Sequence, residues 1–271
     1  MKELFVLCEK GDGQVNEDVC GMCSSFAWVI DGATDVFFRK ALFPCNEVNR
    51  YVNALNERIK QYAPSYQPEQ LQELLSDAIA SLYVELNSGG QLTNIAEYEM
   101  PTFTVAMVSV SADVMRYLVI GDCFISYLSD CGIQMITDTR ISRFSQYNRN
   151  MLKAHYTISN SPVDMQKVYQ ATRKNANQPD GYPIGSVRGS GIIHAVTGQI
   201  QLQPHERFLI CSDGFLDYYR DNSADNLRFF NPDTIQLEIL KMKQFLEDDF
   251  QFRLAPRPKK KDDCTIMLLE V

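Results

Sequence analysis

The sequence lacks any long apolar run. No stretch of its 271 residues approaches the roughly 18 consecutive apolar residues that a membrane-spanning helix needs. At the beginning of the chain, only a short apolar run precedes Glu9 and Lys10, and this run is shorter than the apolar segment of a secretory signal peptide. We therefore expect a soluble, cytoplasmic protein with no membrane contact.

Positive charge is also scarce. The chain has 26 Lys and Arg residues against 34 Asp and Glu residues, and its formal net charge is -8. The sequence has no long basic stretch, and we interpret the short basic run 257–261 as a solvated loop. This balance argues against a surface that binds nucleic acid by neutralising phosphates. Part of the negative charge is available instead for binding metal ions.

The sequence has little that indicates a zinc site. Its 3 histidines are scattered without the spacing of metal ligands. Several of the 8 cysteines lie inside or beside apolar runs, where a free cysteine behaves as a small core residue, and we expect reduced thiols as in the cytosol. Cys20 and Cys23 form a C-x-x-C pair, which can indicate zinc or redox chemistry. No second pair and no nearby histidine accompany it, so we favour a structural role.

Four apolar runs, each typical of a buried strand, carry acids at one end. They are FAWVIDGATD with Asp31, RYLVIGD with Asp122, RFLICSDG with Asp213, and DDCTIMLLEV with Asp262 and Asp263. One acid at a strand end is ordinary turn chemistry, because Asp and Gly favour turns. Four such ends beside long apolar strands predict carboxylates that converge on hard cations. We therefore expect an acidic metal site.

Apolar residues at helical spacing predict two antiparallel helices in the first third of the chain. The first helix follows Pro44 and ends at Pro64, and the second begins at Pro68 and stops at Gly89. Three β-rich runs separated by short turns come next, as in a meander, at 102–110, 115–121 and 123–128. Helices and strands do not alternate here, so we expect an α+β fold rather than a doubly wound parallel sheet.

The remainder of the chain is less regular. The segment from Asp138 to about Gly189 is polar with weak helical periodicity, and we expect a variable insertion that borders the site. Strands are predicted again at 191–196 and 207–212, followed by a helix that begins near Pro232. The sequence shows no internal repeat and no convincing linker, which favours a single domain over residues 1–271.

Five short motifs in chain order resemble the metal-dependent serine/threonine protein phosphatases of the 2C (PPM) type. The motifs are NED at 16–18, VIDG at 29–32, VIGD at 119–122, CSDGF at 211–215 and DDCT at 262–265. Each motif is weak alone, but their order and the acid in each make the resemblance specific, and it covers nearly the whole chain. The resemblance, to a bacterial-like member, implies a four-layer αββα sandwich of two packed antiparallel sheets flanked by helices.

The resemblance also implies a site with two Mn²⁺ or Mg²⁺ ions. Asp31 would bridge the ions, the Gly32 carbonyl and Glu17 would complete one shell, and Asp213 with Asp262 would bind the other ion. Glu17 would reach its ion directly or through water. Asp18 would hold metal-bound waters, Asp122 with Asp213 would form a third, weaker site, and Asp263 would support the ligands. Catalysis would depend on Asp18 and Asp31.

The residue types agree with this chemistry. Hard divalent ions prefer oxygen ligands, and a pair of them can activate a water for attack on phosphate and stabilise the leaving oxygen. No Cys is followed six positions later by Arg, as a cysteine-dependent phosphatase needs, and no Asp-x-Asp pair is present for an aspartyl-phosphate enzyme. The Gly121-Asp122 pair lacks the histidine-containing surroundings of the other binuclear phosphatase family.

Two positions depart from the family pattern. Gly13 stands where members commonly place a phosphate-binding Arg, and Lys10, Arg39 or Lys40 are candidate substitutes. Ala33 stands where animal and plant members place a His proton donor. Two functions stay open: a phosphatase that acts on phosphoserine or phosphothreonine in proteins, and a catalytically weak binding or regulatory module. For the enzyme we expect a monomer that opposes a serine/threonine kinase.

Overall fold

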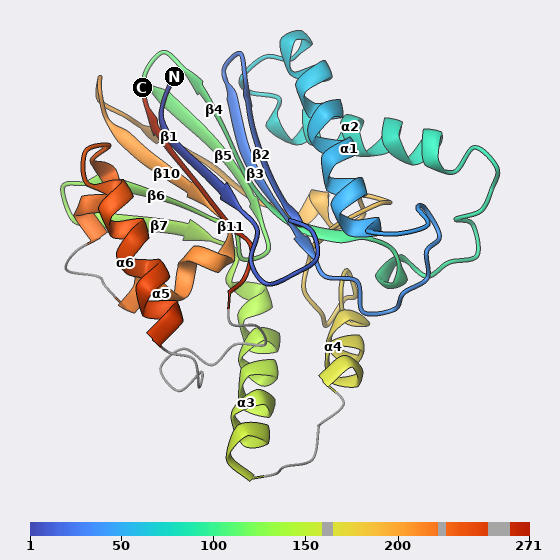
Figure 1. Cartoon of the computed structure of the whole chain (residues 1–271). Helices are drawn as coiled ribbons and strands as arrows, with labels where there is room; N and C mark the ends of the chain where they lie inside the picture. The colour runs from blue at the N-terminus through green and yellow to red at the C-terminus, as the bar shows by residue number, and fades with distance from the viewer. Residues whose placement is uncertain (159–164, 222–225, 249–260) are drawn as a thin grey trace.

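Two antiparallel sheets form the centre of the computed structural model, which describes residues 1–158, 165–221, 226–248 and 261–271 (Figure 1). One sheet has the strand order β1-β11-β10-β6-β7, and the other has the order β2-β3-β4-β5-β9, with β8 paired to β4. The strands are β1 (Lys2–Glu9), β2 (Asp18–Cys23), β3 (Phe26–Ala33), β4 (Thr102–Ser111), β5 (Val114–Ile120), β6 (Phe124–Ser129), β7 (Gly132–Thr137), β8 (Gly185–Ser186), β9 (Val196–Gln201), β10 (Arg207–Cys211) and β11 (Cys264–Glu270).

The two sheets pack face to face because the central strands carry apolar residues on both of their faces. Ala27 and Val29 of β3 belong to the apolar layer between the sheets, which also contains Ile210 and Met267 of the other sheet. Trp28 of β3 instead joins the core beneath the helices on the outer face. Side chains alternate between the two faces of a strand, so a strand that is covered on both faces reads as a continuous apolar run.

Helices cover both outer faces. The pair α1 (Glu47–Tyr62) and α2 (Leu71–Leu86) packs on the sheet that contains β3, and α5 (Leu216–Asp221) with α6 (Ile235–Asp248) packs on the sheet that contains β10. The predicted helix pair and the predicted αββα sandwich are therefore confirmed. None of the helices in the described ranges is both long and apolar enough to cross a membrane.

The structure corrects the prediction of a three-strand meander. Runs 102–110 and 115–121 pair as β4 and β5, but run 123–128 becomes β6 and pairs with β7 and β10 in the other sheet. The chain changes sheets at Gly121 and Asp122. Periodicity could not reveal this crossing, because the short turn between the two runs also suits a hairpin. The predicted strand 191–196 is wrong as well, since Ile192–His194 forms a 3-10 turn and β9 begins at Val196.

The polar segment after Asp138 contains two helices that extend beyond the sheets at one end of the sandwich, α3 (Ser142–Ile158) and α4 (Met165–Arg173) (Figure 1). Further elements that the sequence analysis did not predict include β7, β8 and α5. That the segment is a variable insertion, and that the chain is one domain, stay predictions. The predicted loop over the basic run 257–261 lies outside the described residues except for Lys261.

Gly121 has a backbone conformation that only glycine adopts without strain. Its φ is +76°, and a Cβ at this position would lie 2.3 Å from Thr104 Cγ2 and 2.6 Å from Thr104 Cβ. Thr104 belongs to a buried strand and cannot retreat easily. Gly132, the first residue of β7, has a φ of +95° but open space around it. Comparing the two glycines therefore distinguishes the effect of backbone strain, present at both positions, from that of steric conflict, present only at Gly121.

We expect Gly121→Ala to lower the free energy of unfolding more than Gly132→Ala does. A left-handed conformation costs a non-glycine residue roughly 1–2 kcal/mol, and the overpacking at Gly121 adds roughly 1–3 kcal/mol. Urea unfolding of both variants in chelator measures the difference. Equal losses would mean that the contact between position 121 and Thr104 relaxes without cost.

Candidate functional site

Asp31 lies at the end of the apolar stripe that β3 presents to the other sheet. Ala27 and Val29 face the layer between the sheets, so Asp31, two residues further on, continues the same face. β3 extends through Ala33, and Asp31 pairs with Asp18 of β2 on one side and Thr104 of β4 on the other. Asp31 is therefore not the turn residue that its sequence context suggested. β2 and β3 form an antiparallel pair that brings Asp18 directly beside Asp31.

The acids at the other strand ends reach the same place. Asp122 lies in the connection between β5 and β6, Asp213 follows β10, and Asp262 precedes β11. All three line a cavity of about 300 Å³ together with Asp31, Gly32 and Glu17. Residues separated by more than two hundred positions thus meet at one edge of the layer between the sheets. Of the predicted site residues, only Asp18 does not line this cavity.

Burial and mutual repulsion dominate the electrostatics of this cavity. Desolvation raises the pKa of Asp31 well above its ordinary value, and the charges of Asp18, Asp213, Asp122 and Asp262 raise it further. The pKa of Asp213 is also raised well above its ordinary value by desolvation and by the charges of Asp122 and Asp262, while a hydrogen bond with Asp31 lowers it. Like charges in a poorly solvated site disfavour ionisation. The site therefore attracts positive charge.

Asp122 has the same main cause of perturbation. Desolvation raises the pKa of its carboxyl, and the charges of Asp262 and Asp138 raise it further. A backbone hydrogen bond and the positive charge of Arg149 on α3 act in the opposite direction. The pKa of Asp122 is thus affected both by other acids and by one cation of the segment that follows β7.

Asp18 has a buried carboxylate oxygen without a partner. The residue is 2% exposed, and Ser212 Oγ donates a hydrogen bond to its Oδ2 at 2.7 Å. The other oxygen, Oδ1, has no hydrogen-bond partner within the described residues. Desolvation raises the pKa of Asp18 to about 7, against the hydrogen bonds from Ser212 and Thr265. A buried polar atom without a partner is costly, and a cation or a water held by one would relieve that cost.

Asp263 fixes the loop that carries Glu17. Its Oδ1 accepts a hydrogen bond from Gly11 N at 2.7 Å, and its Oδ2 accepts one from Glu17 N at 2.6 Å. The Glu17 carbonyl accepts the Gly32 N–H at 3.0 Å, and Thr34 Oγ1 donates to Glu17 Oε2 at 2.7 Å. A Cβ on Gly32 would lie 2.5 Å from Val48 Cγ1 and 2.7 Å from the Glu17 carbonyl oxygen, so only glycine fits.

The donor set suits hard cations, although the ligands are not assembled around one. Carboxylate and carbonyl oxygens are the ligands that Mg²⁺ and Mn²⁺ prefer. In the described ranges, no group of three or more His, Cys, Asp or Glu side chains is arranged so that it could hold a metal ion as it stands. Asp31 also lowers the pKa of Asp213 through a side-chain interaction, so the two carboxyls act on each other at short range.

The C-x-x-C pair does not form a metal or redox site. Cys20 packs against the layer between the sheets, and Cys23 packs against the core beneath α1 and α2. Residues three apart in a strand point to opposite faces. All eight cysteines are free thiols.

The three candidate substitutes for a phosphate-binding cation lie elsewhere. Lys10 Nζ donates to the Gly13 carbonyl at 2.7 Å on an exposed loop. Arg39 pairs with Glu99 through two hydrogen bonds of 3.0 and 2.8 Å. Lys40 lines a neighbouring cavity of about 430 Å³. None of the three lines the acidic cavity.

The segment that follows β7 forms one wall of the acidic cavity. The sequence analysis predicted that this segment borders the site. The wall residues come from the 3-10 turn before α3, from α3, from α4 and from the loop that follows α4: Ile141, Phe144, Ser145, Asn148, Tyr169, Thr172, Arg173, Tyr182 and Ile184. The sequence analysis named none of them. The segment is polar, and its sequence gave no pattern that distinguishes residues lining a cavity from residues on a solvated surface.

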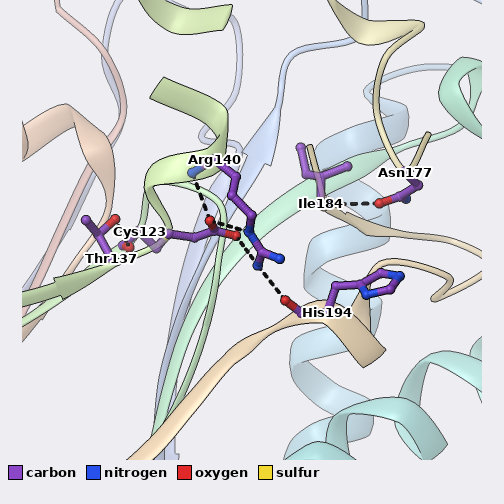
Figure 2. Close-up of polar contacts among 7 residues, drawn as sticks. Cys123, Thr137, Arg140, Asn177, Ile184 and His194 are labelled. Carbon is purple, nitrogen blue, oxygen red and sulfur yellow. Dashed lines mark hydrogen bonds and ion pairs between the residues drawn. The ribbon is translucent and has the colours of Figure 1, made fainter. Parts of the chain in front are cut away.

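Hydrogen bonds attach the base of this wall to the sandwich (Figure 2). Arg140 donates to both oxygens of the buried Asp138 at 2.8 and 2.7 Å and also to the His194 carbonyl. On the far side, Ile184 N donates to Asn177 Oδ1 at 2.9 Å, which closes the loop after α4. The wall therefore has a fixed position relative to the acids.

The sandwich of two sheets with helices on both outer faces is also found in known structures. Solved structures with the same fold over nearly the whole chain are serine/threonine phosphatases of the PPM type, so the fold implied by the five motifs is confirmed. The sequence itself matches no protein-family model and no curated protein.

Three of these solved structures illustrate the likeness. Serine/threonine phosphatase Stp1 from Staphylococcus aureus is 15% identical with a TM-score of 0.60, and the match covers 98% of this chain and 94% of that chain. PppA, a regulatory component of the T6SS in Pseudomonas aeruginosa, is 13% identical with a TM-score of 0.56, covering 98% and 96%. The catalytic domain of the phosphatase PstP, solved with 2 manganese ions, is 12% identical with a TM-score of 0.53, covering 97% and 95%. At these identities the likeness establishes the fold.

We expect Asp31→Asn to stabilise the metal-free protein. Removing one charge relieves the repulsion that raises the neighbouring pKa values, by roughly 1 kcal/mol, somewhat less than one pKa unit. A raised pKa means that stability is lost as the carboxyl ionises, so the gain should be largest near about pH 8 and shrink toward about pH 4. Urea unfolding in chelator at several pH values measures it.

Asp130→Asn is the matched control, because Asp130 is exposed in the turn between β6 and β7. It should leave stability nearly unchanged. A destabilised Asp31→Asn beside an unaffected control would contradict the crowding of charges at Asp31.

Proposed function

We propose that this protein is a Mn²⁺- or Mg²⁺-dependent phosphatase that hydrolyses phosphoserine or phosphothreonine in proteins. The observation that carries the proposal is the convergence of acids from five separate places in the chain on one cavity: Glu17, Asp31, Asp122, Asp213 and Asp262. Structural carboxylates that serve only as turn residues have no reason to meet in a poorly solvated space, where their repulsion opposes folding. The shared fold with PPM phosphatases supports the same reading.

The residues present fit a site for two divalent ions. Glu17, Asp31 and the Gly32 carbonyl would hold one ion, Asp31, Asp213 and Asp262 would hold the other, and Asp122 with Asp213 would offer a weaker third position. Divalent ions, when bound, supply a water of lowered pKa and stabilise charge on phosphate oxygens. Asp18, whose Oδ1 has no hydrogen-bond partner among the described residues, would accept a hydrogen bond from water held at this site. Asp263 would keep Glu17 in place through its backbone N–H.

A cysteine nucleophile has no support in the same region. Cys123 is buried, and Thr104, which lines the acidic cavity, is its hydrogen-bond partner at 3.1 Å. Desolvation and the charge of Asp31 raise the pKa of the Cys123 thiol well above its ordinary value. Since the thiolate is the reactive form, this cysteine is inert at neutral pH.

A second candidate function is a catalytically weak binding or regulatory module. Gly13 and Ala33 replace residues that the family resemblance associates with phosphate binding and proton donation. Metal binding without turnover would favour this candidate. The presence of every acid that the resemblance requires favours the enzyme.

Further parts of the proposal rest on the sequence. We propose that the substrate is a phosphoprotein produced by a serine/threonine kinase. We also propose that the protein is a monomer in the cytoplasm. The free state of the cysteines agrees with a reducing compartment.

Hydrolysis of an aryl phosphate or a phosphothreonine peptide should require added Mn²⁺ or Mg²⁺ and stop in chelator. Ions that bind only the native protein should also raise its melting temperature, by mass action worth about 2.7 kcal/mol at one hundred times Kd. Steady-state assays and thermal melts, each with and without chelator, give the two readouts. Turnover that survives thorough chelation would rule the mechanism out, whereas a metal-dependent melt without turnover would support the binding module.

Asp213→Asn should lower turnover by roughly 100-fold or more, a barrier increase of about 2.7 kcal/mol. Cys20→Ser should stay within about twofold of the starting rate, because a structural thiol takes no part in the chemistry. Rates at saturating Mn²⁺, with circular dichroism as a check on folding, measure both. An equally severe loss in a folded Cys20→Ser protein would revive a thiol mechanism.

A further inference from the structure

Arg173 is the one cationic residue that lines the acidic cavity within the described part of the chain. It is the last residue of α4 and stands opposite carboxylates that belong to the sandwich. A phosphate monoester carries about two negative charges near neutral pH. Such an anion needs a positive partner when it enters a cavity lined by acids. Arg173 is placed to supply one.

The guanidinium of Arg173 is anchored by neutral groups. Its NH1 donates to Thr102 Oγ1 at 2.5 Å, and Thr102 is fully buried at the start of β4. A second hydrogen bond with Arg173 lowers the pKa of Tyr182, although desolvation raises that pKa more. In the ranges that the structure describes, Arg173 forms no ion pair with a carboxylate. Its charge is therefore not neutralised by an acid, in contrast to that of Arg39, which pairs with Glu99.

Contacts of its neighbours fix the end of α4 that carries Arg173. Thr172 Oγ1 donates to Asn148 Oδ1 of α3 at 2.8 Å, and Gln170 Nε2 donates to the Val36 carbonyl at 2.7 Å. The turn after α4 is closed by Ala176 N, which donates to the Arg173 carbonyl at 2.9 Å. Tyr182 packs against Phe144 with ring centroids 4.8 Å apart. With its backbone fixed and its NH1 bound to Thr102, the Arg173 side chain loses less conformational entropy when it binds a ligand.

We propose that Arg173 binds the phosphate group of the substrate, from the α3–α4 wall of the cavity. Arginine offers five N–H donors in a planar fork that matches two phosphate oxygens, and the contacts with Thr102 and Tyr182 use only part of them. Position 13 lines a neighbouring cavity, holds glycine and supplies no cation. This inference rests on the proposed function and names the residue that would recognise the phosphate there.

The first test measures binding without turnover. Calorimetry with inorganic phosphate and protein in excess Mg²⁺ should show that Arg173→Ala weakens phosphate binding roughly tenfold, as expected for the loss of hydrogen bonds to a charged group. Arg173→Lys keeps one positive charge but loses the fork, so its phosphate affinity should be intermediate. Lys174→Ala is the matched control, because Lys174 is the next residue, is exposed and does not line the cavity. It should bind phosphate as the unaltered protein does.

The second test measures turnover of a phosphothreonine peptide. Arg173→Ala should raise KM by roughly tenfold and change kcat by less than about threefold, the pattern of lost ground-state binding. Unaltered protein that hydrolyses neither this peptide nor an aryl phosphate would refute the proposed function. Active unaltered protein, together with an Arg173→Ala variant whose KM and phosphate affinity are unchanged, would refute the role of Arg173 alone.

A purely structural role for Arg173 gives a different result. The melting temperature would then fall in Arg173→Ala while the phosphate affinity of the folded protein stayed constant, and this outcome overturns the inference. If Arg173→Ala does not fold, the lysine variant decides: full phosphate affinity in folded Arg173→Lys contradicts recognition by the fork, and reduced affinity supports it.

Discussion

Repulsion among desolvated carboxylates is the constraint on which the rest of this structure depends. Asp31, Asp122 and Asp213 have pKa values raised chiefly by burial and then by one another. Nothing local to any of these residues would keep them together, because each prefers water and distance from the others. They stay together because they are rigidly attached to strand ends, and the strands are held by apolar layers on both faces of each sheet. The packing of the sandwich thus offsets the unfavourable free energy of bringing these carboxylates together.

The two halves of the cavity have complementary charge. The sandwich contributes the acids, and the segment after β7 contributes Arg173 on the facing wall and Arg149 close to Asp122. Asp138 attaches this segment to the sheets: its backbone N–H donates to the Gly121 carbonyl at 3.2 Å, and its carboxylate holds Arg140. The residue is buried at the end of β7, beside the point where the chain changes sheets. One buried acid therefore sets the position of the cationic wall relative to the acidic floor.

Local patterns predicted much of the fold. The apolar spacing in α1 and α2 marks helices with one buried face, and continuous apolar runs mark β3 and β4 because both faces of these strands are covered. Such patterns failed where a choice between partners was needed. The short turn at Gly121 and Asp122 suits a hairpin as well as a crossing, and only the apolar layer between the sheets decides that β6 pairs with β10 rather than with β5.

For the site, the sequence by itself determined which acids stand at strand ends, and so the chemical class of ligand that they suit. The tertiary structure decided that these acids meet, since Glu17 and Asp262 are far apart in the chain and come together only because β1 pairs with β11. It also decided which cation faces them. The sequence analysis named Lys10, Arg39 and Lys40 as candidate cations and did not name Arg173, which lies in the short polar helix α4. The sequence determines the charge of a side chain, but the packing of distant elements determines which cavity that side chain lines.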